Sequence, residues 1–192
     1  YKRQLQIVWQ QFVDMEFEKA ANHLAETYLL DIAQRTNDKE LQASLEIYGN
    51  TSLGAVAPDF KWNVEEKGKK KSQSLSSIDV AENYAVVFWS STCSHCLKEI
   101  PQLYQYTKNK KELHVLAIAL ENDKDGFDKY TPKYKKWTNI LALEKWENHI
   151  AKTYKINATP SYFVLDQDKK IEAKPEYFED VKAYLEGLDT FK

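Results

Sequence analysis

The sequence predicts an α/β protein that begins with a helical extension. Three short apolar runs, at residues 84–90, 113–120 and 161–166, have the length and the Val, Ile, Phe and Tyr content of buried strands. Segments with the apolar spacing of helices separate these runs. Strands that are apolar on both faces and alternate with helices indicate a sheet covered by helices on both sides.

The first 48 residues have the pattern of a helical hairpin. No Pro or Gly occurs before Gly49, and "RTNDKE" at 35–40 is the one interruption, where Asn37 or Asp38 can cap a second helix that runs to Tyr48. Apolar side chains recur at three- and four-residue spacing before the interruption: Leu5, Val8, Trp9, Phe12, Met15, Ala20, Ala21, Leu24 and Tyr28. The segment "GNTSLGAVAPDF" at 49–60, rich in Gly and small residues, then marks a domain boundary.

Further helices are expected between and after the strands. The segment from Ser94 to about Lys108 has helical spacing, and so do residues 124–136 and 145–154. "SYFVLDQDKKIEA" predicts a hairpin that turns at "DQDKK", and residues 176–189 close the chain as a helix.

Composition excludes several function classes. Lys and Arg (27) nearly balance Asp and Glu (29), so no overall field draws the chain to nucleic acid. No window approaches the roughly 18 apolar residues that cross a bilayer. The chain opens at Tyr1 rather than Met, which leaves room for a leader or membrane anchor before it.

The only two cysteines, Cys93 and Cys96, directly follow the first predicted strand, at the start of a predicted helix. Unpaired backbone N–H groups and the helix dipole favour negative charge there, so Cys93 gains thiolate character. Cys96 lies one helical turn further on, within reach of Cys93. We therefore expect Cys93 to attack a partner's disulfide and Cys96 to resolve the mixed disulfide.

Other uses of two close thiols remain open at this point. A zinc site needs two more ligands, and the histidines are scattered singly, as His23, His95, His114 and His149. A copper site of two thiolates and one imidazole suits the preference of Cu(I) for soft ligands. Inert buried cysteines are the last alternative.

Three motifs together resemble the landmarks of the thioredoxin superfamily. "VVFWSSTCSHCLKEIPQL" resembles its active-site region, "GAVAPDF" the entry of its TlpA/ResA-like branch, and "INATPSYFVLDQDKKI" a strand entered through a cis-proline. Their order and spacing match over residues 53 to about 189. The resemblance implies a thioredoxin-like three-layer fold with a central mixed sheet flanked by helices, in a domain of residues 49–192 that follows the helical extension of residues 1–48.

The resemblance also implies roles for single residues. Pro160 corresponds to the proline whose cis bond with Thr159 lies beside the disulfide and presents backbone groups to a substrate chain. Trp89 corresponds to the aromatic residue that ends the central strand. Glu99 matches a glutamate common in the TlpA-like branch.

The chain departs from thioredoxin itself at two positions. Val87 stands where thioredoxin has a buried aspartate that assists proton transfer to the second cysteine. Thr92 stands where thioredoxin has Trp, directly before the first cysteine. The route of proton transfer to Cys96 and the choice of partner therefore do not follow from the resemblance.

The residues between the cysteines are Ser94 and His95, and a histidine directly before the second cysteine resembles the strongly oxidising DsbA-like enzymes. An imidazole there can donate a hydrogen bond or positive charge to the Cys93 thiolate. This stabilises the reduced state and raises the reduction potential. His95 and Thr159 together therefore predict that the Cys93–Cys96 redox couple is more oxidising than that of thioredoxin.

The resemblance implies a thiol-disulfide oxidoreductase that exchanges its Cys93–Cys96 dithiol and disulfide with protein thiols and disulfides. It implies no organic cofactor or metal, and an upstream redox partner that the sequence does not identify. It also implies a protein of the bacterial periplasm or cell envelope, with any membrane anchor placed before Tyr1.

Two alternatives belong to other classes. A peroxiredoxin-like peroxidase is the enzymatic one, because "APDF" also opens peroxiredoxins. Val86 and Ser90, however, stand where those enzymes have Pro and Thr. A copper-binding thioredoxin-like chaperone is the alternative among binding proteins.

Overall fold

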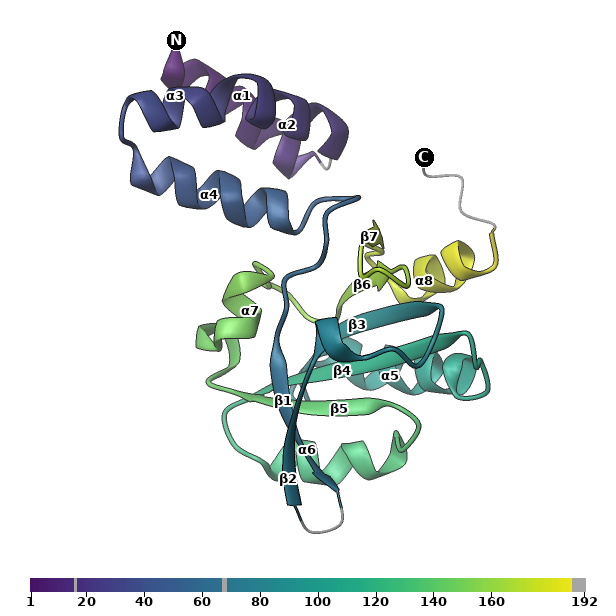
Figure 1. Ribbon diagram of the computed structural model, residues 1–192. Coiled ribbons are helices and arrows are strands. Elements are labelled where there is room, and N and C mark those ends of the chain that lie inside the picture. The colour runs from purple at the N-terminus through teal and green to yellow at the C-terminus, as the bar shows by residue number, and fades with distance from the viewer. Residues whose placement is uncertain (16, 67–68, 188–192) are drawn as a thin grey trace. The chain divides into compact units, whose positions relative to one another are not determined.

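A computed structural model describes residues 1–15, 17–66 and 69–187 of the chain (Figure 1). The chain forms two compact units, Tyr1–Ala55 and Val56–Lys192, and each is described by itself. The first is helical and the second combines a sheet with helices, so the predicted α/β class is confirmed. No helix within the described ranges is long and apolar enough to span a membrane.

The helical unit contains one more break than the sequence analysis expected. Helix α1 (Lys2–Asp14) is followed by a longer run in which α2 (Glu18–Leu24) continues through a π-helical turn into α3 (Leu30–Arg35). Helix α4 (Lys39–Asn50) completes the unit. The break lies between Asp14, the last residue of α1, and Glu18, the first residue of α2.

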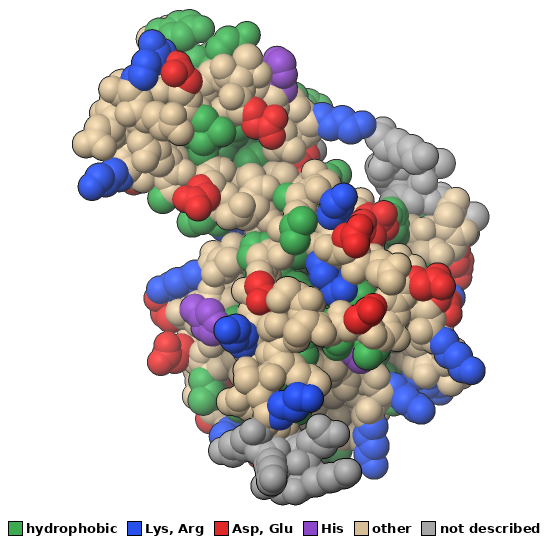
Figure 2. All heavy atoms as spheres, viewed as in Figure 1, with side chains coloured by type: hydrophobic (Ala, Val, Ile, Leu, Met, Phe, Trp, Pro, Cys, Tyr) green, Lys and Arg blue, Asp and Glu red, His purple; other side chains and the backbone are tan. Residues whose placement is uncertain are grey.

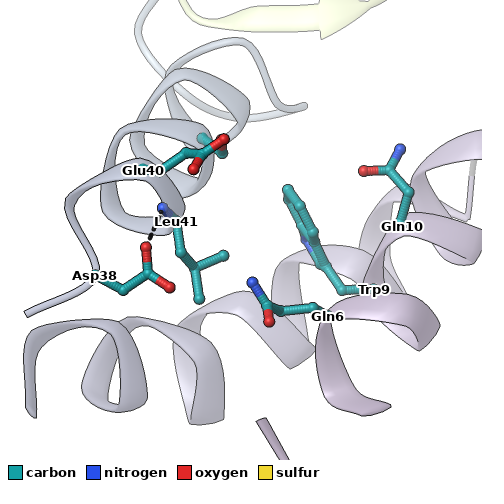
Figure 3. A pocket seen from close by; sticks show the side chains of 7 residues that line it. Gln6, Trp9, Gln10, Asp38, Glu40 and Leu41 are labelled. Atoms are coloured by element: carbon teal, nitrogen blue, oxygen red, sulfur yellow. Dashed lines mark hydrogen bonds between the residues drawn. The ribbon is translucent and has the colours of Figure 1, made fainter. Parts of the chain in front are cut away.

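Trp9 and Tyr48 lie at the centre of the helical unit, with their rings edge to face at 5.4 Å and 86°. Figure 3 shows Trp9 and Leu41 beside a pocket of about 320 Å³ between α1 and α4. Asp38 caps α4 by accepting a hydrogen bond from the Leu41 N–H at 3.0 Å. The hydrogen bond from Lys2, together with this cap, holds the pKa of Asp38 below its usual value.

The second unit is built on a five-stranded mixed sheet in the order β5-β4-β3-β6-β7. Its strands are β3 (Asn83–Trp89), β4 (Leu113–Glu121), β5 (Thr138–Leu143), β6 (Ser161–Leu165) and β7 (Ile171–Ala173). β3 is parallel to β4 and antiparallel to β6, and β4 is parallel to β5. A separate antiparallel hairpin, β1 (Lys61–Glu66) and β2 (Lys69–Ser74), precedes the sheet.

Helices and the β1–β2 hairpin cover the two faces of this sheet (Figure 1). Along β3, Tyr84, Val86 and Phe88 enter one apolar cluster, and Ala85, Val87 and Trp89 enter the other. The first cluster also contains residues of the hairpin and of α7 (His149–Thr153). The second contains residues of α5 (Ser94–Thr107), α6 (Asp125–Tyr130) and α8 (Phe178–Leu185). Charged side chains of both signs are interspersed on the face in Figure 2, as the balanced composition predicts.

The three predicted strands are β3, β4 and β6, each displaced by at most one residue at either end, and α5 begins at Ser94 as expected. Strand β5 and the β1–β2 hairpin were not predicted. The helix expected at 124–136 is α6 followed by a 3₁₀ turn that ends at Lys133, and the helix at 145–154 is a 3₁₀ turn followed by α7. The helix predicted at 176–189 forms as α8, which ends at Leu185. Positions 188 and 189 of the prediction lie outside the described residues.

Candidate active site

Cys93 is the N-cap residue of α5, in the loop that follows the central strand β3. Its sulfur accepts a hydrogen bond from the Cys96 N–H at 3.1 Å, and its thiol lies 3.2 Å from the carbonyl oxygen of Thr159. Cys93 is half-buried, and both cysteines are free thiols. The structure therefore presents the dithiol form of the pair.

Opposing effects act on the pKa of Cys93, and the net result lies below the usual thiol value. Burial raises the pKa, but hydrogen bonds from Cys96 and from the Thr159 side chain, with a further one from the His95 backbone, outweigh it. The N–H groups of His95 and Cys96 are available to the sulfur because they lie in the first turn of a helix, where N–H groups have no carbonyl partner. The geometry thus favours the thiolate.

Cys96 has the opposite surroundings. Its side chain is fully buried, in the apolar cluster that also contains Val87 and Ile100. Burial, with a smaller contribution from Cys93, raises the pKa of Cys96 to about 12. One cysteine is therefore poised as a thiolate and the other is kept protonated.

Sheet pairing brings Thr159 beside the cysteines. β6 runs antiparallel to β3 with Ser161 opposite Phe88, so the residues before β6 lie next to the loop that follows β3. The peptide bond between Thr159 and Pro160 is cis. Thr159, 66 positions after Cys93 in the sequence, thus lies beside the Cys93 sulfur.

Three other residues singled out in the sequence occupy different surroundings. Ser94 is exposed as the first residue of α5. His95 is also exposed, and among the described residues its imidazole makes no hydrogen bond to Cys93. The contribution of His95 to the thiol comes from its backbone. Trp89 is buried at the end of β3, with its ring edge-on to Tyr130 and Tyr134.

Glu99 accepts two hydrogen bonds through the same carboxylate oxygen. Tyr162 donates its hydroxyl at 2.9 Å, and Phe178 donates its backbone N–H at 2.8 Å. Tyr162 lies on β6 and Phe178 begins α8, so Glu99 joins three elements one turn beyond Cys96. Burial, followed by the neighbouring Glu99, raises the pKa of Tyr162 far above its usual value, and both cysteines contribute to this.

Two further contacts beside the cysteines were missed by the sequence analysis. The buried carboxylate of Glu121 accepts hydrogen bonds from Ser91, and the Lys145 ammonium donates to the Thr92 hydroxyl at 3.1 Å. Glu121 did carry a sequence signal, because it is the one charged residue in the strand "LHVLAIALE". A charge at the carboxyl end of a buried strand indicates a specific partner.

The described residues contain no group of three His, Cys, Asp or Glu side chains arranged to hold a metal ion. The geometry beside Cys93 and Cys96 instead consists of hydrogen-bond donors to a sulfur. Such an arrangement favours the thiolate form of Cys93.

Comparison with known proteins places this geometry in a family. A thioredoxin-like family model matches residues 82–171, which include both cysteines and Pro160. The thiol-disulfide oxidoreductase ResA of a Bacillus cereus strain is 30% identical over 141 residues, which cover 70% of this chain and 75% of that protein. The chain belongs to the ResA-like thiol-disulfide oxidoreductases. The fold, the family and the activity predicted from the sequence are thereby confirmed.

Solved structures of similar proteins agree with the assignment of this chain to the ResA-like family. The thioredoxin domain of a thiol-disulfide oxidoreductase from Bacteroides vulgatus is 26% identical, with a TM-score of 0.59 over 71% of this chain and 96% of that domain. A domain of a possible thiol-disulfide isomerase from Cytophaga hutchinsonii is 29% identical, with a TM-score of 0.56 over 70% of this chain and 91% of that domain. A thioredoxin-like protein from Bacteroides caccae, 19% identical, shares the fold over 98% of this chain and 78% of its own, with a TM-score of 0.64.

Proposed function

We propose that Cys93 is the nucleophile and Cys96 the resolving thiol of this ResA-like oxidoreductase, acting on disulfides and dithiols of partner proteins. The observation that carries the proposal is the contrast between the two sulfurs. Cys93 is half-buried with a lowered pKa, whereas Cys96 is fully buried with a pKa raised to about 12. A partner can therefore reach the first sulfur, and the second reacts only within the protein.

The reaction proceeds in two balanced exchanges. The Cys93 thiolate attacks one sulfur of the partner's disulfide, forms a mixed disulfide and releases the partner's other sulfur as a thiolate. Cys96 then loses its proton and attacks the Cys93 sulfur. This closes the Cys93–Cys96 disulfide and releases the second partner thiol, so the partner gains two electrons and the oxidoreductase loses two. The same steps in reverse oxidise a partner dithiol.

The surrounding residues have supporting roles in this proposal. The backbone of Thr159 and Pro160 flanks the Cys93 sulfur, where an extended partner chain can align beside it. The backbone of His95 helps to stabilise the thiolate, Trp89 fills the core beneath the loop, and Glu99 lies next to the resolving thiol on α5. Ser94 is exposed and available for contact with the partner.

The site of action in this proposal is the bacterial periplasm or cell envelope. The resemblance to the TlpA/ResA-like branch supports it, because proteins of that branch typically work outside the cytoplasm. Cell fractionation of the full-length gene product checks this point. Recovery in the cytoplasmic fraction alone would contradict it.

The two roles separate in a trapping experiment. The purified protein is expected to reduce insulin disulfides with dithiothreitol as electron donor, and both Cys93→Ser and Cys96→Ser should abolish turnover. Only Cys96→Ser should accumulate a mixed disulfide with a disulfide-bonded substrate, because its nucleophile is intact and its resolving thiol is gone. Efficient peroxide consumption without disulfide reduction, or stoichiometric Cu(I) binding without it, would contradict the proposal.

A further inference from the structure

Glu121 is a buried carboxylate beside the active-site loop. It is the last residue of β4 and is only 3% exposed. Its Oε1 accepts a hydrogen bond from the Ser91 N–H at 2.5 Å, and its Oε2 accepts one from the Ser91 hydroxyl at 3.0 Å. Both oxygens thus bind a single residue, which offsets the cost of burying the carboxylate.

Ser91 lies in the short loop between β3 and α5, two residues before Cys93. The neighbouring loop residues bond mainly to one another. The Thr92 N–H donates to the Ser90 Oγ at 3.3 Å, and the Cys93 N–H donates to the Ser90 carbonyl at 3.2 Å. The Glu121–Ser91 pair therefore ties this loop to the rigid end of a buried strand, and the Lys145 ammonium makes a separate, exposed bond to the Thr92 hydroxyl.

Helix α6 closes over this pair. A Cβ atom at Gly126 would lie 1.9 Å from the Ser91 Oγ, 2.4 Å from the Ser91 Cβ and 3.5 Å from the Glu121 Oε2. Any side chain at position 126 must therefore displace Ser91. The backbone of α6 at Gly126 thus packs directly against Ser91 and Glu121.

We infer that Glu121 is a positioning residue for thiol-disulfide exchange, which fixes Ser91 and thereby holds the Cys93 sulfur at the first turn of α5. This inference rests on the proposed role of Cys93 as nucleophile. The hydrogen bond from the Cys96 N–H reaches the sulfur only while Cys93 keeps its N-cap conformation, and the loop that sets this conformation is held by Glu121. Glu121 acts through Ser91 and touches neither sulfur in any hydrogen bond of the described residues.

A matched pair of substitutions at position 121 tests the inference. In Glu121→Ala both bonds to Ser91 are lost, and alkylation of Cys93 by iodoacetamide at neutral pH should slow about fivefold, the factor that corresponds to one hydrogen bond of ~1 kcal/mol. The inflection of the alkylation rate with pH should move upward. In Glu121→Gln the side-chain oxygen still accepts from the Ser91 N–H and the amide can donate to the Ser91 hydroxyl. This variant should therefore retain most of the wild-type profile.

A second pair approaches the same contact from α6. Gly126→Ala should reproduce the slower alkylation, because the new methyl group displaces Ser91. Gly49→Ala, at a helical glycine whose added Cβ meets nothing within 4 Å, is the control and should leave the profile unchanged. Where Glu121→Ala fails to fold by circular dichroism, Gly126→Ala and Ser91→Ala provide the measurement.

Three results would overturn the inference. They are an unchanged pH profile in folded Glu121→Ala, a Gln variant as impaired as the Ala variant, and a Gly126→Ala protein that reacts like wild type. The first means that Glu121 contributes only to stability, and the second that the bonds which Gln can still make to Ser91 do not position Cys93. Failure of the proposed function is distinguishable, because the wild-type protein itself would then lack a reactive Cys93.

Discussion

The backbone N–H of Cys96 donates a hydrogen bond to the sulfur of Cys93 at 3.1 Å, while the side chain of Cys96 is itself fully buried. One residue therefore stabilises its partner's thiolate through its backbone and keeps its own proton through burial. The N-terminal turn of α5 produces both effects. The N–H group of Cys96 points back at the Cys93 sulfur, while the side chain of Cys96 enters the apolar core.

Alkylation of the reduced protein should show a reactive cysteine whose rate inflects below the usual thiol pKa of about 8.5. The pKa of Cys93 is lowered, so its thiolate is already present at pH values where an ordinary thiol is protonated. The rate should therefore reach its plateau at lower pH than that of free cysteine. Iodoacetamide kinetics from pH 5 to 10, with Cys93→Ser as the control, measure this. An inflection at or above that of free cysteine would contradict the assignment.

The reduced protein should lose stability at alkaline pH through Cys96 and Tyr48. Burial raises the pKa of each to about 12, above its value in an unfolded chain. Each neutral group therefore contributes stability that is fully present below its unfolded pKa and lost as pH rises toward 12. Urea unfolding at pH 7.5, 9 and 10.5 measures the loss. Tyr48→Phe should make the pH dependence shallower, and an unchanged dependence would show that Tyr48 does not titrate in this range.

The hydrogen bonds that stabilise the Cys93 thiolate should raise the reduction potential of the Cys93–Cys96 couple. A stabilised Cys93 thiolate favours the reduced form, which is what a higher potential means. A glutathione redox titration measures the potential. Thr159→Ala, which removes a side-chain donor to the sulfur, should lower the potential, and a variant with the wild-type potential would contradict the prediction.

Loss of the Tyr162 hydroxyl should destabilise the α/β unit. In Tyr162→Phe, Glu99 loses one of its two donors in a partly buried setting, which should lower the free energy of unfolding by about 1 kcal/mol. The same change in Tyr184→Phe removes an exposed bond to Glu172 and should cost much less. Urea denaturation of the two variants makes the comparison. Equal losses would mean that the Tyr162–Glu99 bond is as weak as the exposed one.

Trp9→Ala should unfold the helical unit without impairing the thiol chemistry. Trp9 packs edge-on against Tyr48 in the apolar cluster of the first unit, and such a truncation costs about 3 to 5 kcal/mol. Helical circular dichroism should fall, while insulin reduction per molecule should stay near wild type. Loss of reductase activity in parallel with helicity would show that the two units do not fold independently.

The sequence was sufficient to predict the parts of the fold whose signals are local. Strands β3 and β4 are long apolar runs buried on both faces, so composition alone predicts them. Strand β5 is a six-residue segment between helical patterns, and a run that short does not separate strand from helix by periodicity. The β1–β2 hairpin is rich in Lys and polar residues, and its pairing does not follow from an apolar pattern.

The candidate site was predictable to a similar degree. The roles of Cys93 and Cys96 could be predicted from local sequence. Their spacing is one helical turn, and they stand at the N-terminus of a predicted helix. The bond from Ser91 to Glu121 joins residues 30 positions apart, and that from Glu99 to Tyr162 joins residues 63 apart. Only the folded sheet brings these partners together. The side chain of His95 was expected to support the thiolate, whereas the structure assigns that contribution to its backbone.

The burial of Cys96 also determines how the protein meets chemical damage. A hydroperoxide can reach Cys93 but not the fully covered sulfur beneath it, so the first product is a sulfenic acid at the outer position. The inner thiol can condense with that sulfenic acid and release water, which closes a reversible disulfide. The pair is thereby spared conversion to the sulfinic and sulfonic acids, from which thiol reductants do not recover it.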